Sequence, residues 1–300
     1  MNEFDFNTLP VRISTIKGKN IYHFKSTDDN IDHETVIAFG DEWSKFNSFS
    51  MEEITSIALK HYFDIVPKNY IKDKKLLDVG CGTGRWTKYV SQFAKTVDAV
   101  DPSRAIESAA SLLTDCNNVR LSQVSVNDLP FDDNSFDFVF SLGVLHHIPD
   151  TALAMKQCVA KVKPGGYFLT YLYYNFDNRG ITYKSVFQLS TLLRRVVCNL
   201  PSKLKDAICD VLAVIIYIPL VWSATFFKNI GLRSISKKIP LHFYIGKSFH
   251  IIRNDARDRF GTPLEQRFSK SEIRLMMDNA GLKEIYFSDN EPFWHVIGKK

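Results

Sequence analysis

The sequence predicts an α/β fold built on a mostly parallel sheet, and three observations support this prediction. Short apolar runs alternate with segments of helical period between residues 76 and 173, as in sheets covered on both faces. One run, Leu76–Val79, enters a turn rich in glycine and then a helix. Acidic residues, Asp78 and Asp101, close two successive runs. In open α/β sheets such strand ends are where ligands bind.

Length and composition place the chain among ordinary globular proteins. It has 300 residues, 45% hydrophobic and 24% charged, enough for one large or two small domains. The net charge of +5 is too mild to indicate nucleic acid, and much of the excess falls between Arg179 and Arg259. The five cysteines form no C-x-x-C pair, and no Asp/Glu/His cluster has ligand spacing, so we expect no disulfide framework and no metal. The scattered cysteines favour reduced thiols and a cytoplasmic location, and we do not expect the acidic, polar segment Met1–Pro10 to be a signal peptide.

Residues 1–50 are predicted to form an N-terminal extension. Alternating apolar residues on either side of Lys17-Gly18-Lys19-Asn20 predict a short hairpin over Val11–Phe24. Residues 26–33 are expected to be a polar loop. Ser50 and Glu53 have the spacing of a capping box, so a helix should run from about Met51 to Val66.

The turn Gly80-Cys81-Gly82-Thr83-Gly84 has the composition of a backbone that touches a ligand. Glycine lacks a Cβ atom, so the chain can turn sharply and approach a bound molecule. The following helix directs free N–H groups and its positive end toward the turn, and Asp78 can accept an ammonium group. Neither a P-loop nor a dinucleotide fingerprint fits the spacing, and a tight turn without a ligand is the alternative.

The run from Leu77 to Gly84 resembles the first motif of the class I S-adenosylmethionine-dependent methyltransferases, most closely the bacterial small-molecule enzymes. The resemblance implies a Rossmann-like sheet of seven strands in the order 3-2-1-4-5-7-6, with S-adenosyl-L-methionine as cofactor. It also implies that Asp101 binds the ribose hydroxyls, although a strand-end carboxylate exposed to solvent is the alternative. The cofactor residues implied here are Asp78, Gly80, Cys81, Gly82, Gly84, Asp101 and Pro102.

The loop that follows the predicted third strand, Val119–Val124, resembles the family's adenine-binding segment but departs from it. When Leu129-Pro130-Phe131 is aligned with the family pattern, the adenine-binding aspartate falls on Ser125. A serine hydroxyl accepts from the adenine amine without a charge, and the Val126 N–H is expected to meet adenine N1. Asn127 or Asp128 replaces the acid if the loop is shifted.

The fourth strand, Phe136–Ser141, leads into a segment that resembles the family's post-strand S-x-x-L-x-H-x-x-D pattern. The segment should line the reaction pocket, and Ser141, Leu142 and His146 are assigned to the cofactor. His147 is a candidate base because imidazole can remove a proton from a hydroxyl, whereas packing or capping of the next helix is the alternative. The chain lacks the Pro-Pro-aromatic motif of amine methylation and the Pro-Cys nucleophile of C5-pyrimidine enzymes.

Residues 174–253 are predicted to be a helical lid or substrate-specificity insertion within a core of residues 51–173 and 254–300. Residues 211–227 carry no charge, are slightly short for a membrane span and contain Pro219, which we expect to break the helix. Basic residues flank this run. The segment therefore fits a buried lid, which we favour, or an interfacial helix in peripheral contact with a membrane.

Four residues are assigned to the acceptor side. Trp43 belongs to Phe39–Phe46, which resembles a segment that covers the pocket in related enzymes; pinning of the N-terminal helix to the core is the alternative. Tyr244, Arg259 and Arg267 supply polar groups, although as surface residues they would need no further role. A second capping box at Ser269 starts a helix, and residues 282–287 and 293–297 should form an antiparallel edge pair.

The predicted function is methyl transfer from S-adenosylmethionine to a small molecule, with the acceptor an oxygen of a sugar, lipid-linked sugar or secondary metabolite. One alternative is an RNA or protein methyltransferase, which the mild charge and the missing RNA-binding module disfavour. The other is a catalytically silent relative that binds a membrane or protein partner. The predicted location is the cytoplasm, with peripheral attachment at the inner membrane surface as an option. The oligomeric state does not follow from the sequence.

Overall fold

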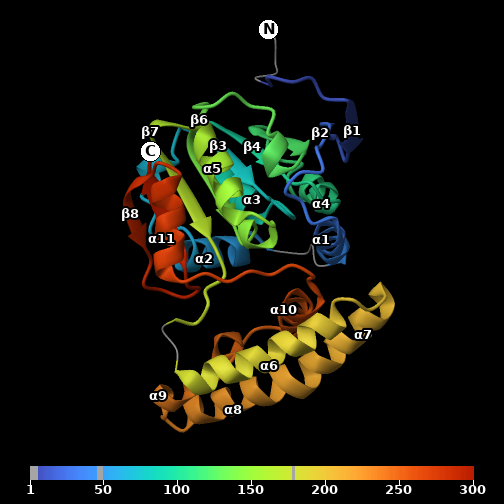
Figure 1. The fold of residues 1–300 in the computed structure, drawn as a ribbon, viewed down its shortest axis with the longest axis vertical. Coiled ribbons are helices and arrows are strands. Elements are labelled where there is room, and N and C mark those ends of the chain that lie inside the picture. Colours follow the sequence, from blue (N-terminus) through green and yellow to red (C-terminus); the bar gives the residue numbers. More distant parts are fainter. Residues whose placement is uncertain (1–5, 46–49, 178–179) are drawn as a thin grey trace. The chain divides into compact units, whose positions relative to one another are not determined.

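The computed structural model describes residues 6–45, 50–177 and 180–300, and it divides into two compact units. The sheet unit contains residues up to Asp177 and from Leu264 to Lys300, and the helical unit contains Asn178–Pro263 (Figure 1). The sequence placed the return to the core at residue 254, whereas residues 254–263 belong to the helical unit. Phe46 of the predicted Phe39–Phe46 segment lies outside the described residues.

The sheet unit is built on one sheet whose order is β1-β2-β5-β4-β3-β6-β7-β9-β8. From β5 to β8 this is the predicted order 3-2-1-4-5-7-6, with five parallel strands and an antiparallel pair at the edge. The strands of this part are β3 (Lys75–Val79), β4 (Thr96–Val100), β5 (Val119–Gln123), β6 (Phe136–Leu142), β7 (Val162–Tyr171), β8 (Lys283–Phe287) and β9 (His295–Lys299).

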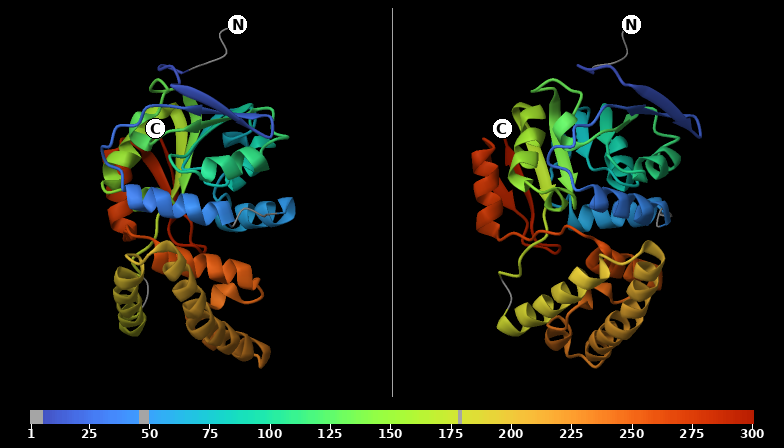
Figure 2. Two further views of the ribbon diagram at one scale, coloured as in Figure 1. Left: turned by 90° about the vertical axis from the view of Figure 1, so that its right-hand side faces the viewer. Right: turned by 45° about the vertical axis from the view of Figure 1, so that its right-hand side comes forward.

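The predicted N-terminal hairpin forms, but it also extends the sheet. Strands β1 (Arg12–Ile16) and β2 (Lys19–His23) pair antiparallel, and β2 then pairs parallel with β5. Figure 2 shows the hairpin, in deep blue, continuing one edge of the sheet. Ile21 is fully buried opposite Leu121, which gives the hairpin an apolar reason to dock. The sheet therefore has nine strands, and the expectation of seven was wrong in number.

Helices cover both faces of this sheet (Figure 1). Apolar residues of α2 (Met51–His61), α3 (Arg85–Ser91) and α4 (Ala105–Leu112) share a core cluster with Leu76, and α5 (Thr151–Lys161) and α11 (Lys270–Asn279) share another with Leu77. Adjacent strand residues thus enter opposite cores. Burial on both faces explains why the strand sequences are apolar runs.

The predicted loop at residues 26–33 leads into a helix that the sequence analysis missed, α1 (His33–Lys45). Asp32 begins it by accepting a hydrogen bond from the Thr35 N–H at 2.8 Å. Helix α2 starts with the predicted capping box of Ser50 and Glu53 but ends at His61, earlier than expected. Short 3₁₀ turns fill several loops of the sheet unit: Lys68–Tyr70 (η1), Val126–Asp128 (η2) and Leu145–His147 (η3).

The helical unit has a core of its own. Cys209, Ala213, Tyr217, Ile252 and Phe260 form a buried cluster within it. Its elements are α6 (Ile181–Val197), α7 (Ser202–Leu212), the π-helical turn η4 (Ala213–Tyr217), α8 (Ile218–Asn229), α9 (Arg233–Ser236), η5 (His242–Tyr244) and α10 (Phe249–Gly261).

The expected break at Pro219 does not occur. Helices α7 and α8 run on through η4 as one helical segment, with Pro219 at the start of α8. Proline lacks an N–H and clashes with the preceding turn of a regular α-helix. The π-helical turn directly before it changes the local hydrogen-bond spacing, which lets the helix pass the proline without ending.

Candidate functional site

The glycine turn lies between β3 and α3 at the carboxyl edge of the sheet. The N–H groups of Gly80 and Cys81 donate to the Val100 carbonyl at 2.8 and 3.0 Å, which ties the turn to the end of β4. The Gly82 N–H donates to Asp101 Oδ2 at 2.9 Å. The tips of β3 and β4 therefore form one continuous edge, in the arrangement that the sequence predicted.

The three glycines of the turn have different physical roles. All have positive φ angles, +80° at Gly80, +53° at Gly82 and +80° at Gly84. A Cβ atom at Gly80 would lie 2.4 Å from Val144 Cγ2, and one at Gly84 would meet a leucine side chain at 2.7 Å. At Gly82 the nearest atom is Trp43 Nε1 at 3.9 Å, an ordinary contact. Gly80 and Gly84 are thus required by packing, whereas Gly82 leaves room for a ligand.

Both acids at the strand tips are buried. Asp78 Oδ2 accepts from the Thr87 hydroxyl at 2.6 Å, and burial raises the pKa of this carboxyl to about 7, against the effect of that bond. Asp101 Oδ1 accepts from the N–H and hydroxyl of Ser103 at 2.8 and 2.6 Å, and burial also raises its pKa. A carboxylate has about four lone-pair sites, so Asp101 retains acceptor capacity. A bound cation or hydroxyl donor would favour the charged form of either acid.

Asp128, one of the two residues named as a replacement for the missing adenine-binding acid, holds the predicted adenine loop through its hydrogen bonds. Ser125 donates its hydroxyl proton to Asp128 Oδ2 at 2.8 Å. Asp128 also accepts from the N–H and hydroxyl of Thr27, both at 2.9 Å, and the Asn127 amide donates to the Asp29 carbonyl. The negative charge absent at position 125 therefore lies against the Ser125 hydroxyl. The contacts of Ser125 and Val126 with adenine stay predictions.

Ser141, Leu142 and Cys81, which were assigned to the cofactor, are buried. Ser141 also has a hydrogen-bond partner inside the sheet. Its hydroxyl donates to the Val79 carbonyl at 2.8 Å and links β6 to β3. Leu142, the last residue of β6, is buried. Cys81 is also buried, and burial raises the pKa of its thiol well above its usual value. The half-buried Pro102 follows β4 beside Asp101, with its carbonyl accepting from Gln123 at 3.2 Å. Their roles at the cofactor stay predictions.

His146 is a fully buried side chain whose ring nitrogens have no hydrogen-bond partner within the described residues. Its ring lies 3.9 Å from the Tyr173 ring, centroid to centroid. Burial, assisted by the nearby His147 and Arg267, lowers the pKa of His146 well below its ordinary value, so the ring is neutral. A neutral imidazole carries one donor and one acceptor, and leaving both unsatisfied in a protein interior is costly. The position predicted for a cofactor contact thus offers unused hydrogen-bonding groups.

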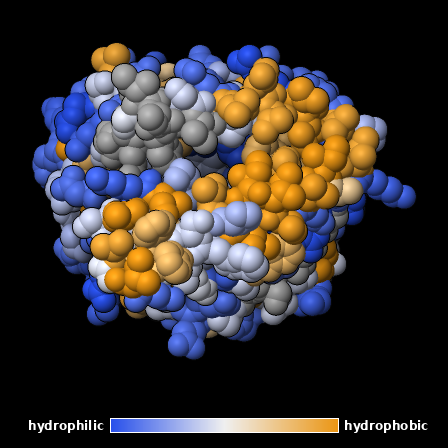
Figure 3. Space-filling model, turned by 90° about the horizontal axis from the view of Figure 1, so that it is seen from below, coloured by the Kyte–Doolittle hydropathy of each residue, from blue (hydrophilic) through white to orange (hydrophobic). Residues whose placement is uncertain are grey.

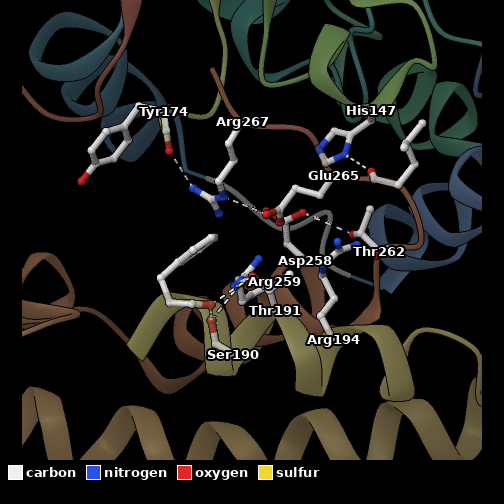
Figure 4. A network of polar contacts seen from close by, with 12 residues as sticks. His147, Tyr174, Ser190, Thr191, Arg194, Asp258, Arg259, Thr262, Glu265 and Arg267 are labelled. Atoms are coloured by element: carbon white, nitrogen blue, oxygen red, sulfur yellow. Dashed lines mark hydrogen bonds and ion pairs between the residues drawn. The ribbon is translucent and has the colours of Figure 1, made fainter. Parts of the chain in front are cut away.

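His147, the candidate base, is held in one tautomer. Its Nδ1 lies 2.7 Å from the Leu264 carbonyl, a contact drawn in Figure 4. A carbonyl oxygen can only accept, so Nδ1 carries the proton and the neutral ring has its lone pair on Nε2. The Phe39 ring packs edge-on against the imidazole at 4.7 Å. This is the protonation pattern that a general base requires.

The sequence analysis missed a buried arginine and an aromatic layer beside the turn. The Arg85 guanidinium lies 4.8 Å from the Trp43 ring and 5.1 Å from the Trp86 ring. Burial lowers the pKa of Arg85, an effect opposed by Tyr62, Glu42 and Tyr173. Adjoining rings of the layer lie 4.9 to 5.7 Å apart; its members are Tyr62, Trp86, Tyr171 and Tyr173. Alternate tyrosines at 171 and 173, at the end of a predicted strand, were the available signal.

Arg267 lies in the sheet unit, close to His146. Its Nε donates to Glu265 Oε1 at 2.9 Å, and one terminal nitrogen donates to the Tyr174 carbonyl at 3.3 Å (Figure 4). The guanidinium also lies 5.0 Å from the Tyr173 ring. Of the four residues assigned to the acceptor side, Arg267 and Trp43 are therefore both in the unit that carries the glycine turn.

The other two residues assigned to the acceptor side belong to the helical unit and have partners there. The Tyr244 hydroxyl donates to Asp255. Arg259 donates to the hydroxyls of Ser190 and Thr191, both at 2.8 Å, and Figure 4 shows these contacts. Their contact with an acceptor stays a prediction.

These groups fit S-adenosylmethionine by their chemistry. Asp78 suits its ammonium group and Asp101 its ribose hydroxyls, while Gly82 leaves the backbone accessible. The unsatisfied nitrogens of His146 suit a polar ligand. Within residues 6–45, 50–177 and 180–300, no group of three or more His, Cys, Asp or Glu side chains could hold a metal ion.

Comparison with known proteins points to the same ligand. Residues 77–170 match the family model described as a methyltransferase domain. This segment is a class I S-adenosylmethionine-dependent methyltransferase domain. The cofactor of the methyltransferase domain is S-adenosylmethionine, as the sequence predicted. The match spans the glycine turn, Asp101 and His147, whereas Trp43, Tyr173 and Arg267 lie outside it.

Curated relatives also match part of the chain. A demethylmenaquinone methyltransferase from Staphylococcus carnosus is 35% identical over 32% of this chain and 41% of its own length. A ubiquinone biosynthesis O-methyltransferase from Coxiella burnetii is 28% identical over 47% of this chain and 62% of its own. A tRNA U34 carboxymethyltransferase from Nautilia profundicola is 30% identical over 34% of this chain and 35% of its own. The chain thus spans about a third to three fifths of the length of these relatives.

Proposed function

We propose that the chain is an enzyme that transfers the methyl group of S-adenosylmethionine to an oxygen atom of a small-molecule acceptor. The observation that carries the proposal is His147, whose Nδ1 faces the Leu264 carbonyl and whose Nε2 lone pair is suited to a hydroxyl proton. The sulfonium supplies the methyl group, its S–C bond breaks with the electron pair left on sulfur, and an O–C bond forms. The hydroxyl proton passes to Nε2.

The aromatic layer supports a small or planar acceptor. The rings of Tyr62, Trp86, Tyr171 and Tyr173 pack tilted or edge-on against one another, and Tyr173 also packs against His146. Aromatic faces bind the apolar faces of sugars and planar rings, and their hydroxyls can orient a polar edge. A sugar, lipid-linked sugar or secondary metabolite is the acceptor class that we favour. The names of two relatives add quinone rings to the acceptors worth testing.

Two alternatives stand beside this proposal. An RNA acceptor draws support from the name of one relative, which acts on tRNA U34. A catalytically silent chain that binds a membrane or protein partner would keep the fold without turnover. Intact Asp78 and Asp101 with their hydrogen bonds favour a binding-competent cofactor site over the silent alternative.

A methyl-transfer assay with radiolabelled S-adenosylmethionine separates these cases. Acceptor pools of glycans, lipid-linked sugars, quinone precursors and tRNA are offered to the wild type, to His147→Gln and to His147→Ala. Loss of a general base should lower kcat by about 10²- to 10⁴-fold, with cofactor affinity unchanged. Unchanged turnover in His147→Ala would remove this residue from the mechanism. Labelling of tRNA alone would replace the small-molecule acceptor with RNA.

A further inference from the structure

The helical unit exposes more large hydrophobic residues than the sheet unit, although it is the shorter of the two. Of the 23 large hydrophobic residues exposed within the described residues, 14 lie in Asn178–Pro263, a segment of 86 residues. Figure 3 shows apolar atoms gathered in a broad patch beside hydrophilic surface. Scattered exposed hydrophobic residues are ordinary, but a continuous patch marks an interaction surface.

The long helical segment of α7, η4 and α8 carries an apolar stripe on its exposed side. Its members are separated by seven, four, seven and four residues, which places them on one helical face: Leu204, Val211, Ile215, Trp222 and Phe226. Trp222 is 71% exposed. The buried side of the same segment, with Cys209, Ala213 and Tyr217, belongs to the core of the helical unit. The stripe is therefore not needed for that core.

Helix α6 repeats this arrangement. Leu189, Leu192, Leu193 and Val196 follow the i, i+3, i+4, i+7 spacing of a single helical face, and all are exposed. The buried residues of the same helix include Arg194 and Val197. Two helices of the unit thus present apolar faces to the outside.

Cations accompany these apolar faces. The helical unit has 14 Lys and Arg against 4 Asp and Glu, a formal charge of +10, whereas the rest of the chain has 24 against 29, a charge of −5. Exposed basic residues lie at both ends of the apolar stripe and after it, namely Lys203, Lys228, Arg233, Lys237 and Lys238. Apolar side chains bordered by cations complement a surface of anionic headgroups over hydrocarbon.

The long helical segment is suited to lie on a bilayer rather than to cross it. Lys203–Asn229 is long and apolar enough to span, with a mean hydropathy of 2.1 in its best window, a third of which is buried. On its buried side, however, Asp210 receives two hydrogen bonds from Arg253, at 2.8 and 2.6 Å, and Asp206 pairs with Arg257 at 3.4 Å. A spanning orientation would carry these charges toward hydrocarbon, whereas an interfacial one keeps them in the protein.

We propose that the helical unit docks on a bilayer containing anionic phospholipid, through the apolar stripe Leu204–Phe226 and the basic residues that border it. A second copy of the chain fits the same surface less well, because two units of charge +10 repel each other. The docking is peripheral, and it is independent of the methyl-transfer proposal, since it needs neither cofactor nor acceptor. Attachment to the inner face of a membrane is the location that follows.

Vesicle flotation of the purified full chain tests the apolar part of the proposal. We expect the wild type to float with vesicles of phosphatidylglycerol and phosphatidylcholine, and Ile215→Asp to lose at least about tenfold in partitioning. The matched control is Leu275→Asp, because Leu275 on α11 of the sheet unit and Ile215 are both 60% exposed. This control should float like the wild type. Equal flotation of Ile215→Asp and the wild type, or no flotation of a folded wild type, would overturn the proposal.

Charge reversal and salt test the electrostatic part. Lys237→Glu and Lys238→Glu should each weaken partitioning about fivefold on phosphatidylglycerol vesicles, and added salt should reduce the binding of the wild type. The matched control is Lys72→Glu, an exposed lysine of the sheet unit. Binding that is equally strong on pure phosphatidylcholine and insensitive to salt would contradict the anionic surface.

Trp222 provides a direct optical reading of the docked face. The chain has four tryptophans, and Trp222 alone among them belongs to the exposed class; Trp86 and Trp294 are buried and Trp43 is half-buried. Vesicles should shift the fluorescence emission to shorter wavelength in the wild type but not in Trp222→Phe, which should still float. A shift that persists in Trp222→Phe would show that another face meets the lipid.

Two other occupants of the face are separate outcomes, and each would overturn the proposal. A dimer in solution that dissociates in Ile215→Asp, together with absent flotation, would assign the face to a second copy. Slower methyl transfer in Ile215→Asp with unchanged flotation would assign it to the acceptor. Because flotation is measured without cofactor and titration of S-adenosylmethionine without vesicles, failure of docking and failure of the proposed enzyme activity remain distinguishable.

Discussion

The sheet unit and the helical unit place similar apolar sequences in opposite environments. Phe136–Leu142 of β6 is an apolar run covered by helices, and Phe138 and Phe140 are fully buried. The run at residues 211–227 is longer than this strand and carries no charge, yet Ile215 and Trp222 are exposed. Hydropathy alone does not separate the two cases. The difference lies in the neighbours: a strand has partners on both faces, whereas the long helical segment packs one side on α10 and, among the described residues, exposes large apolar side chains on the other.

The largest expected effect is on the free energy of unfolding, when one aromatic residue in each unit is replaced by alanine. Phe140→Ala should lower the free energy of unfolding by about 3–5 kcal/mol, because it opens a cavity in the sheet core. Trp222→Ala should change it by less than about 0.5 kcal/mol, because that side chain is mostly exposed. Urea denaturation followed by far-UV circular dichroism measures both. Comparable losses would mean that Trp222 is covered by protein in solution and would weaken the contrast between the units.

A second pair of variants compares packing with ligand room inside the glycine turn. Gly80→Ala adds backbone strain and a clash with Val144, and should destabilise the protein by about 2–5 kcal/mol. Gly82→Ala adds the strain alone, about 1–2 kcal/mol, but places a methyl group where the backbone is open. Thermal melts should rank the two in that order.

The glycine variants also test whether the cofactor touches the turn. Gly82→Ala should remain folded yet bind S-adenosylmethionine at least about tenfold more weakly, because ligand and backbone can no longer approach closely. Calorimetric titration gives the affinity. If Gly82→Ala binds like the wild type, the cofactor does not touch the turn at this residue.

The raised pKa of Asp78, in the sheet unit, predicts that the affinity for S-adenosylmethionine depends on pH. The folded carboxyl, with a pKa of about 7, must lose its proton before it pairs with an ammonium group. Affinity for S-adenosylmethionine should therefore rise about eightfold from about pH 6 to about pH 7.5, with a proton released on binding. Titrations in buffers of different ionisation enthalpy measure that proton. Asp78→Asn should abolish the dependence of the enthalpy on the buffer.

Stability of the ligand-free protein should change in the opposite direction. A carboxyl whose folded pKa exceeds its unfolded value of about 3.9 stabilises the fold fully below that value. This contribution is lost as the pH rises through about 7. Denaturation of the wild type should show the loss between about pH 4 and about pH 7, and Asp78→Asn should flatten the profile. A profile that stays the same in Asp78→Asn would assign the titration to another group.

The smallest expected effect is in an ion pair of the helical unit. Arg253 and Asp210 form two hydrogen bonds but are each about one third exposed, so water and salt screen the pair. Arg253→Gln should cost less than about 1 kcal/mol, and added salt should reduce the difference from the wild type. Urea denaturation at low and high salt tests this. A larger and salt-insensitive loss would show that the pair holds the helical unit together.

The strands and the glycine turn were predictable because each depends on a local pattern, whereas the strand order came from the resemblance to the methyltransferase family. Apolar runs between turn residues give the strands, and the spacing of Gly80, Gly82 and Gly84 gives the turn. The capping box at Ser50 gives the start of α2 for the same reason. The N-terminal hairpin was also predicted, but its place in the sheet depends on Ile21 packing beside β5, a contact between distant parts of the chain.

The errors and omissions depend on contacts that sequence spacing does not encode. The continuity of the helix through Pro219 depends on the π-helical turn before it. Arg85 was missed because its neighbours, Trp43 and Tyr173, come from distant segments. Helix α1 was missed because the residue that starts it, Asp32, lies in the segment that was predicted to be a polar loop.

Calorimetric titration with S-adenosylmethionine and S-adenosylhomocysteine, for the wild type and Asp101→Ala, is the most direct test of the central claim. The account predicts that both ligands bind the wild type and that a folded Asp101→Ala binds at least about tenfold more weakly, because the carboxylate acceptor at the tip of β4 is lost. Absence of binding by a well-folded wild type would contradict the account, as would equal affinity in the variant.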